Sequence, residues 1–266
     1  MRAIELAHGA WLGLLGAAEG NPLGVEVAWF GDGDVVASRV GGQPEVQWLQ
    51  HTSGPFTPAV LDEVLAWYAA AGIGPRVELG PTEGYDVLAA RLHAAGLHQS
   101  GFSDRLAGPA ATVGTGGAVD GVVVERLAGD EPSDEFGETL LGGHEVPADA
   151  PPAHAWAAAR FPTLPTHEAF LARDAATGAP MGAALLVAHE GVGYLANAST
   201  LPSARGRGAQ TALIRARCDR ARELGCDTVE VICVPWSVSN RNLRRAGLAV
   251  VHTRVEWTPA PAPAEG

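Results

Sequence analysis

The chain repeats one order of strands and helices in its two halves, and this repetition constrains the fold more than any other feature of the sequence. Three pairs of segments match in the same order: 92–97 with 243–248, a helix ending at Gly72 with one ending at Gly225, and a strand running into Pro81 with one running into Pro235. The offsets between them are 151, 153 and 154 residues. Such constancy indicates an internal duplication.

Each half reads as strand, helix, strand, helix, which predicts α/β units. A length of 266 residues suits two domains, and an apolar fraction of 47% is enough to build their cores. The small, Gly-rich segment 108–117 predicts a flexible linker, and the Pro-rich segment 259–263 a disordered tail. We therefore expect domains at 1–107 and 122–258, joined by a linker at 108–121 and followed by a tail at 259–266.

The formal charge of −12 argues against nucleic acid as a partner. It fits a cationic amine substrate, and equally a protein that net charge keeps soluble. The three cysteines, Cys218, Cys226 and Cys233, form no CxxC pair, so neither a disulfide framework nor a metal site is indicated, and we expect a reducing compartment. The apolar stretch 11–16 is short and interrupted by Gly, which favours a first helix over a signal or membrane segment. We expect a cytoplasmic protein.

A glycine-arginine loop, Arg205-Gly206-Arg207-Gly208, stands between a predicted strand at 191–200 and a helix ending at Gly225. Backbone N–H groups and the helix dipole converge at such a junction, and glycine lets a phosphate approach closely. No Gly-Lys-Ser/Thr follows, and no acidic residue stands where a dinucleotide ribose would need one, which excludes two common nucleotide loops. Nine arginines against four acids in 205–245 favour a polyanionic ligand.

Segment 200–213, Thr-Leu-Pro-Ser-Ala-Arg-Gly-Arg-Gly-Ala-Gln-Thr-Ala-Leu, resembles the acetyl-CoA-binding motif of the GNAT family of N-acetyltransferases, with Gln210 in place of the usual Gly or Ala. Segment 235–248 resembles the second motif of that family, an Asn-bearing helix that flanks the pantetheine arm. The resemblance covers about 122–257. The first half is similar to a degenerate GNAT domain, since its loop at 52–55 lacks the arginines and the second glycine, so we expect no cofactor there.

This resemblance implies an α/β fold of two GNAT-like domains in tandem, each a mixed, centrally splayed sheet flanked by helices. It implies direct transfer of an acetyl group from acetyl-CoA to the amine of a small molecule or peptide, by a monomer or homodimer without nucleic acid or membrane partners. The cofactor would lie between strands 198–200 and 231–234. Its implied contacts are Ala198, Ser199, Thr200, Arg205, Gly206, Arg207, Gly208, Ala209, Gln210, Thr211, Asn240 and Asn242.

The implied catalytic residues are less defined. The backbone N–H groups near Ser199 and Thr200 would polarise the thioester carbonyl. Asn197 and Tyr194 stand where relatives carry a base or a water-holding group, or they are ordinary strand residues. The family often has a proton-donating Tyr at the position that Leu243 occupies here.

Each polar residue ahead of the cofactor core is read first as a solvated surface residue, and a general base is the alternative reading. Within this set Glu145 and His154 are the first candidates for the base: His144, Glu145, His154, His167 and Glu168. Arg217, inside an apolar helix face, predicts an ion pair or hydrogen bond to the helix of Asn242. Trp236 either walls an acceptor pocket or packs in the core, and Cys233 reads as a small buried residue. Rival hypotheses are an acyl-CoA-binding module without turnover and a nucleotide-phosphate binder of another fold.

Overall fold

The computed structural model describes residues 25–31, 35–40, 48–51 and 56–260, which belong to two compact units. Unit 1 runs through Asp104 and also takes the C-terminal residues from His252 onward, while unit 2 comprises Arg105–Val251. The helix expected at 11–16, the loop 52–55 and the end of the tail lie outside the described residues. No helix in the described part of the chain is long and apolar enough to cross a membrane.

Unit 1 is a mixed sheet with two helices. Its strand order is β1-β2-β3-β4-β11-β5, with these bounds: β1 Val25–Phe30, β2 Val35–Val40, β3 Trp48–His51, β4 Arg76–Leu79, β5 Leu97–Pro109 and β11 Ala249–Pro259. Helices α2 (Pro58–Ala70) and α3 (Tyr85–Ala94) pack on the sheet through buried Leu61, Tyr68 and Leu92. The Tyr68 hydroxyl donates to the Ser38 carbonyl at 2.7 Å, which fixes α2 to the sheet.

The last strand of the chain completes the sheet of unit 1. Strand β11 runs antiparallel to β4, with Val255 opposite Leu79, and it buries Trp257 in that core. The Arg254 guanidinium pairs with the buried Glu78 carboxylate at 3.4 Å. The sequence assigned residues up to 258 to the second domain. The contacts place 252–259 in the first unit instead, because β4 and its buried carboxylate are the partners of this strand.

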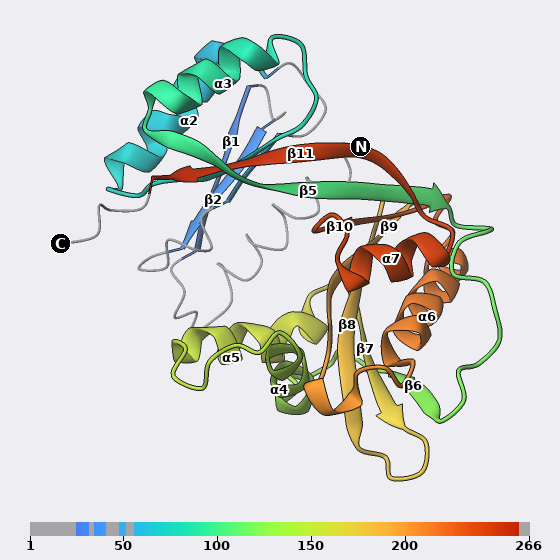
Figure 1. The fold of residues 1–266 in the computed structure, drawn as a ribbon. Helices are drawn as coiled ribbons and strands as arrows, with labels where there is room; N and C mark the ends of the chain where they lie inside the picture. Colours follow the sequence, from blue (N-terminus) through green and yellow to red (C-terminus); the bar gives the residue numbers. More distant parts are fainter. Residues whose placement is uncertain (1–24, 32–34, 41–47, 52–55, 261–266) are drawn as a thin grey trace. The chain divides into compact units, whose positions relative to one another are not determined.

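Unit 2 is also built on a mixed run of β-strands, with helices on both of its faces (Figure 1). Its strand order is β5-β10-β9-β8-β7-β6, and its new strands are β6 Val122–Arg126, β7 His167–Asp174, β8 Pro180–His189, β9 Val192–Thr200 and β10 Thr228–Cys233. Its helices are α4 Asp134–Gly143, α5 Pro152–Arg160, α6 Ala209–Glu223 and α7 Val238–Arg245. Leu213 and Cys218 of α6 pack with Ala184 and Leu186 of β8, while α4 and α5 cover the opposite face.

The predicted repetition is present as an order of elements. The first half contains α2, β4, α3 and β5, and the second half contains α6, β10, α7 and β11 in the same order. A glycine with positive φ follows each of the four helices, as expected for left-handed C-terminal caps: Gly72 at 69°, Gly96 at 82°, Gly225 at 75° and Gly247 at 98°.

The segment expected as a linker packs against unit 2. Strand β5 continues to Pro109, and Val113, which follows it, is completely buried. Arg222 of α6 donates to the carbonyls of Ala110 and Val113 at 2.8 and 2.9 Å. We therefore assign residues 105–121 to unit 2, because the side chains of Ala110 and Val113 supply apolar surface to its core.

Candidate functional site

The middle of the unit 2 sheet opens where β9 separates from β10. The parallel ladder pairs Val192–Tyr194 with Thr228–Glu230 and goes no further in the described register. At the same level the β8–β9 register shifts between Ala183 and Leu185, which marks a β-bulge. Asn197 lies in this bulge with φ of 33°, and bulges bend and twist the strand that carries them. Ala198–Thr200 lie beyond this bend and outside the described β9–β10 ladder, as the splay expected from the sequence requires.

A buried arginine lies beneath the bulge. The side chain of Arg217, on α6, is 2% exposed and donates from Nη1 to the carbonyls of Leu185 and Ala196 at 3.1 and 3.3 Å. Leu185 and Ala196 are the paired residues next to the bulge. Because the ladder is irregular there, the Arg217 guanidinium supplies the donor that their carbonyls need. Burial lowers the pKa of Arg217 to about 10, which leaves it charged at neutral pH. The predicted hydrogen bond exists, but it joins α6 to the sheet and not to α7.

The glycine-arginine loop forms the start of α6. Gly206 and Gly208 have φ of 76° and 87°, values that side chains rarely adopt. Gly208 is the N-cap and offers no side chain to the first N–H groups of the helix, and no acidic residue stands in the first turn. A Cβ built on Gly206 would meet no atom within 4 Å. Unsatisfied helix N–H groups beside open space form a place where an anion binds.

One cleft joins the free edge of β9 to this helix start. It has a volume of about 770 Å³. Ten of the twelve residues expected at the cofactor line it: Ala198, Ser199, Thr200, Arg205, Gly206, Gly208, Ala209, Gln210, Thr211 and Asn242. His144 at the C-cap of α4, and Val238 and Ser239 of α7, also line it.

The side chain of Gln210 bridges the two helices that border the cleft. Its amide donates to the Ser239 hydroxyl at 3.2 Å and accepts from the Asn242 amide. Gln210, which departs from the usual small residue of the motif, therefore ties the first turn of α6 to α7.

Both arginines of the loop are paired with carboxylates. Arg205 contacts Glu145 at 2.7 Å and donates to the Gly143 carbonyl at 3.3 Å. Arg207 bonds to Asp174, and this bond is the main cause that lowers the pKa of the Asp174 carboxyl to about 2. Arg207 does not line the cleft, whereas Arg205 does.

Comparison with known proteins identifies the unit that contains this cleft. Residues 135–248 match the acetyltransferase (GNAT) family, and this range includes every residue that lines the cleft. The chain contains a GNAT-family domain. No match was found among curated proteins.

Solved GNAT structures share the fold over nearly the whole chain. A GCN5-related N-acetyltransferase from Kribbella flavida is 19% identical with a TM-score of 0.65, covering 97% of this chain and 95% of that one. A tandem GNAT protein from the clavulanic acid biosynthesis pathway is 15% identical with a TM-score of 0.61, over 86% and 79%. A GNAT from Sphaerobacter thermophilus is 17% identical with a TM-score of 0.59, over 85% and 77%. At these identities the likeness concerns the fold alone.

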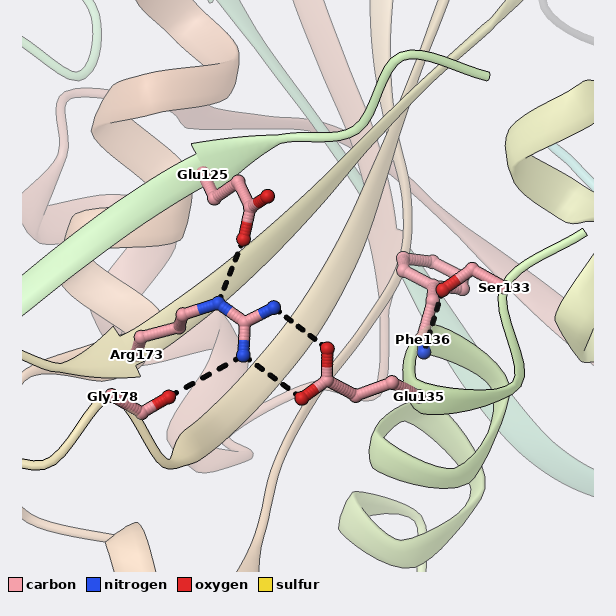
Figure 2. Close-up of polar contacts among 6 residues, drawn as sticks. All are labelled: Glu125, Ser133, Glu135, Phe136, Arg173 and Gly178. Carbon is pink, nitrogen blue, oxygen red and sulfur yellow. Dashed lines mark hydrogen bonds and ion pairs between the residues drawn. The ribbon is translucent and has the colours of Figure 1, made fainter. Parts of the chain in front are cut away.

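The C-terminal end of helix α4 forms another wall of the cleft through Gly143 and His144. Contacts at the N-terminal end of this helix hold it in position. The Ser133 hydroxyl accepts from the Phe136 N–H at 3.2 Å as an N-cap (Figure 2). Glu135, in the first turn, receives two bonds from Arg173 of β7 at 2.9 and 2.7 Å, and Arg173 also bonds Glu125 of β6 at 2.7 Å. The Arg173 bonds hold the pKa of the Glu135 carboxyl below its usual value. The helix is thereby held against the sheet.

The other end of α4 approaches β9 closely. The Ser199 hydroxyl donates to the Leu140 carbonyl at 2.9 Å. A Cβ on Gly143 would come within 2.3 Å of the Ser199 hydroxyl oxygen, so only glycine permits this approach. The approach is what places His144 in the cleft beside the splayed strand.

The predicted catalytic residues do not gather in the cleft. Asn197 is exposed at the bulge, Tyr194 lies at the last β9–β10 pair, and Glu145 is engaged by Arg205. None of the three lines the cleft. His144, weighed at the sequence level but not favoured, does line it. Partial desolvation of its ring lowers the pKa of His144 below the ordinary 6.5, so the imidazole is neutral at pH 7.

Several other sequence candidates have structural partners. Glu168 pairs with Arg126 and Arg220, both at 2.8 Å. Asn240, expected at the cofactor, is 2% exposed, and its amide contacts the Cys233 thiol at 3.5 Å. It faces the end of β10 and not the cleft, because α7 turns it inward.

Leu243, which replaces the usual Tyr, is 2% exposed and packs in the core. Its side chain therefore offers no proton donor. Trp236 is 81% exposed, which excludes the core-packing alternative for this residue. His154 lies on α5 and does not line the cleft.

Proposed function

We propose that this protein is an acetyl-CoA-dependent N-acetyltransferase that transfers the acetyl group directly to the amine of a small molecule or peptide. The observation that carries the proposal is the continuous cleft between the free edge of β9 and the N-terminus of α6. Membership of its domain in an acetyltransferase family supports the same reaction class.

The residues present fit the coenzyme. The first N–H groups of α6, with Gly206 and Gly208, would hold its pyrophosphate, and Arg205 would add charge if it exchanged Glu145 for phosphate. The N–H groups of Ala198–Thr200, which leave the ladder with β10 at the splay, would hold the pantetheine arm and polarise a carbonyl. When bound, acetyl-CoA supplies a thioester open to attack by an amine.

His144 is the residue that we propose as proton acceptor. It lines the cleft together with Ala198–Thr200, where an amine would have to approach. The charged groups adjoining it are Glu145, next in the chain, and Arg205, which pairs with Glu145 and donates to Gly143. A neutral imidazole can accept a proton from the attacking ammonium or amine.

Titration calorimetry with acetyl-CoA, followed by assay of free-thiol release over a panel of amines, tests the proposal. We expect one acetyl-CoA per chain and thiol release with at least one amine. An absence of heat at millimolar acetyl-CoA would refute the assignment of the cleft.

The role of His144 is tested separately by pH. Because the pKa of His144 lies below 6.5, kcat/KM should fall as pH drops through that lowered pKa, where the ring becomes protonated and ceases to be a base. His144→Gln should lower kcat by about 10²-fold, remove this acid limb and leave acetyl-CoA affinity intact. His154→Gln, on α5 and outside the cleft, is the matched control. An acid limb that persists in His144→Gln would contradict the assignment.

A second candidate function is an acyl-CoA-binding module without turnover. The buried Leu243 favours it, because the position that often donates a proton to the leaving thiolate has no ionisable group. Tight acetyl-CoA binding with no thiol release for any amine would support this alternative.

We also propose that unit 1 is a GNAT-like domain without a cofactor. Its order of α2, β4, α3 and β5 repeats that of α6, β10, α7 and β11. The fold likeness to a tandem GNAT protein over 86% of the chain supports this interpretation. A stoichiometry of two acetyl-CoA molecules per chain would refute it.

A further inference from the structure

A second, smaller cavity adjoins the cleft in unit 2. Its volume is about 250 Å³, and its polar lining comes from Thr115, Thr211, Arg215, Asn242 and Arg245. Thr211 and Asn242 line both cavities, so the two are contiguous across these side chains. Arg215 follows Thr211 by one turn of α6, about 6 Å of helix rise farther from the glycine loop.

The two arginines of this cavity differ from those of the glycine loop. Arg205 and Arg207 are each paired with a carboxylate. Among the described residues no carboxylate forms an ion pair with Arg215 or Arg245. Arg215 donates to the Gly117 carbonyl at 2.5 Å, and Arg245 donates to the Asn242 side-chain oxygen at 3.1 Å.

Each of these guanidinium groups therefore keeps donors for another partner, since arginine carries five N–H groups. Two positive charges without counter-charges repel each other and attract anions, here in a protein with a formal charge of −12. The hydroxyls of Thr115 and Thr211 and the amide of Asn242 add neutral donors. This donor set has the chemistry of a phosphate site.

We propose that this cavity binds a phosphomonoester, the 3′-phosphate on the ribose of coenzyme A, and thereby selects coenzyme A over its 3′-dephospho form. The inference rests on the proposed function, which places the pyrophosphate of the same molecule at the start of α6. The cavity lies one turn along that helix, so one nucleotide could bring its two kinds of phosphate to the two places. A phosphate could bind Arg215 and Arg245 without displacing a described carboxylate, whereas at Arg205 it would have to displace Glu145.

Calorimetry with acetyl-CoA and 3′-dephospho-acetyl-CoA tests this inference. Wild-type protein should bind acetyl-CoA about tenfold more tightly than the dephospho form, the effect of one charge-assisted contact. In Arg245→Gln that preference should fall to about twofold or less, with affinity for the dephospho form nearly unchanged. Arg215→Gln should act alike, and thermal unfolding of each variant checks that the segment held by Arg215 remains folded.

Arg244→Gln is the matched control, since Arg244 is an exposed arginine of the same helix that lines neither cavity. It should keep the full preference. Equal affinities of wild-type protein for the two cofactors would overturn the inference while leaving the acetyltransferase proposal standing. Failure of both cofactors to bind would instead refute the proposed function. A loss of preference in Arg244→Gln as large as in Arg245→Gln would indicate general charge attraction and would also overturn the site.

Discussion

Replacement of Arg217 by methionine tests whether the buried arginine shapes the cleft between β9 and α6 or only stabilises the domain. The three bonds from its guanidinium, to Leu185 and Ala196 at 3.1 and 3.3 Å and to Leu213 of its own helix at 3.0 Å, would be lost. Hydrogen bonds from a charged donor contribute about 1.5–3 kcal/mol each, so the gross loss is about 4.5–9 kcal/mol.

Removing the charge offsets part of this loss. Burial lowers the pKa of Arg217 from its ordinary value to about 10, and a change of this size corresponds to a cost of about 3 kcal/mol for keeping the charge inside the protein. The net decrease in the free energy of unfolding is therefore about 1.5–6 kcal/mol. Acetyl-CoA binding should weaken as well, because the carbonyls at the bulge that precedes Ala198–Thr200 would lose their donor.

Urea unfolding measures the first quantity, and calorimetry with acetyl-CoA measures the second. The dissociation constant should rise by about tenfold or more, equivalent to about 1.4 kcal/mol. Arg222→Met is the matched control: Arg222 lies on the same helix and also donates to backbone carbonyls, but those belong to Ala110 and Val113, away from the bulge. It should lower stability without changing affinity. Wild-type affinity in Arg217→Met would refute the reasoning.

Three further variants test other parts of the structure. Gly208→Val should abolish acetyl-CoA binding measured by calorimetry, because the φ of Gly208 is 87° and a Cβ there would lie 2.5 Å from a side-chain carbon of Val119. Gly225→Val is the control: Gly225 has a φ of 75° but lies at the far end of α6, so this variant should retain binding. Ser133→Ala should lower the free energy of unfolding by about 1 kcal/mol in urea, since the N-cap of α4 is lost, and no change would show that the cap is unimportant. Trp257→Ala should cost unit 1 about 3–5 kcal/mol in thermal or urea unfolding, and a loss confined to the cleft-bearing unit would contradict the assignment of β11.

The cleft could be predicted in large part because its walls depend on backbone conformation. Gly206 and Gly208 predict positive φ values and a helix start without side chains, and the structure has both features at the start of α6. The splay also follows from the family motif, since it places Ala198–Thr200 opposite that helix. These features depend on a few adjacent residues, which a sequence displays directly.

The residue that we propose as general base could not be predicted, because its position depends on contacts between distant segments. Glu145 and His144 are neighbours in the sequence, yet only His144 lines the cleft. Glu145 adopts a positive φ of 56° and meets Arg205, sixty residues later. The close approach of Gly143 to Ser199 decides which side chain enters, and nothing local to residues 143–145 encodes Ser199 as a neighbour.

The sequence likewise did not show to which domain the last strand, β11, belongs. Periodicity predicts a strand after α7 but does not indicate with which other strand it pairs. The pairing with β4 joins residues that are 176 positions apart, such as Leu79 and Val255, and it depends on the buried Glu78 finding Arg254.

That pairing has a consequence for biosynthesis. A nascent chain normally folds its N-terminal domain first, while the rest is still being made. Here β4 acquires its neighbour β11 only after the residues from His252 onward have been translated, so the first-made unit must await a strand that is made after the whole of unit 2. Until then β4 has an unpaired edge, which is the kind of surface on which chains aggregate or exchange strands. Synthesis of β11, rather than emergence of the first half, is therefore the event that allows the N-terminal unit to finish folding.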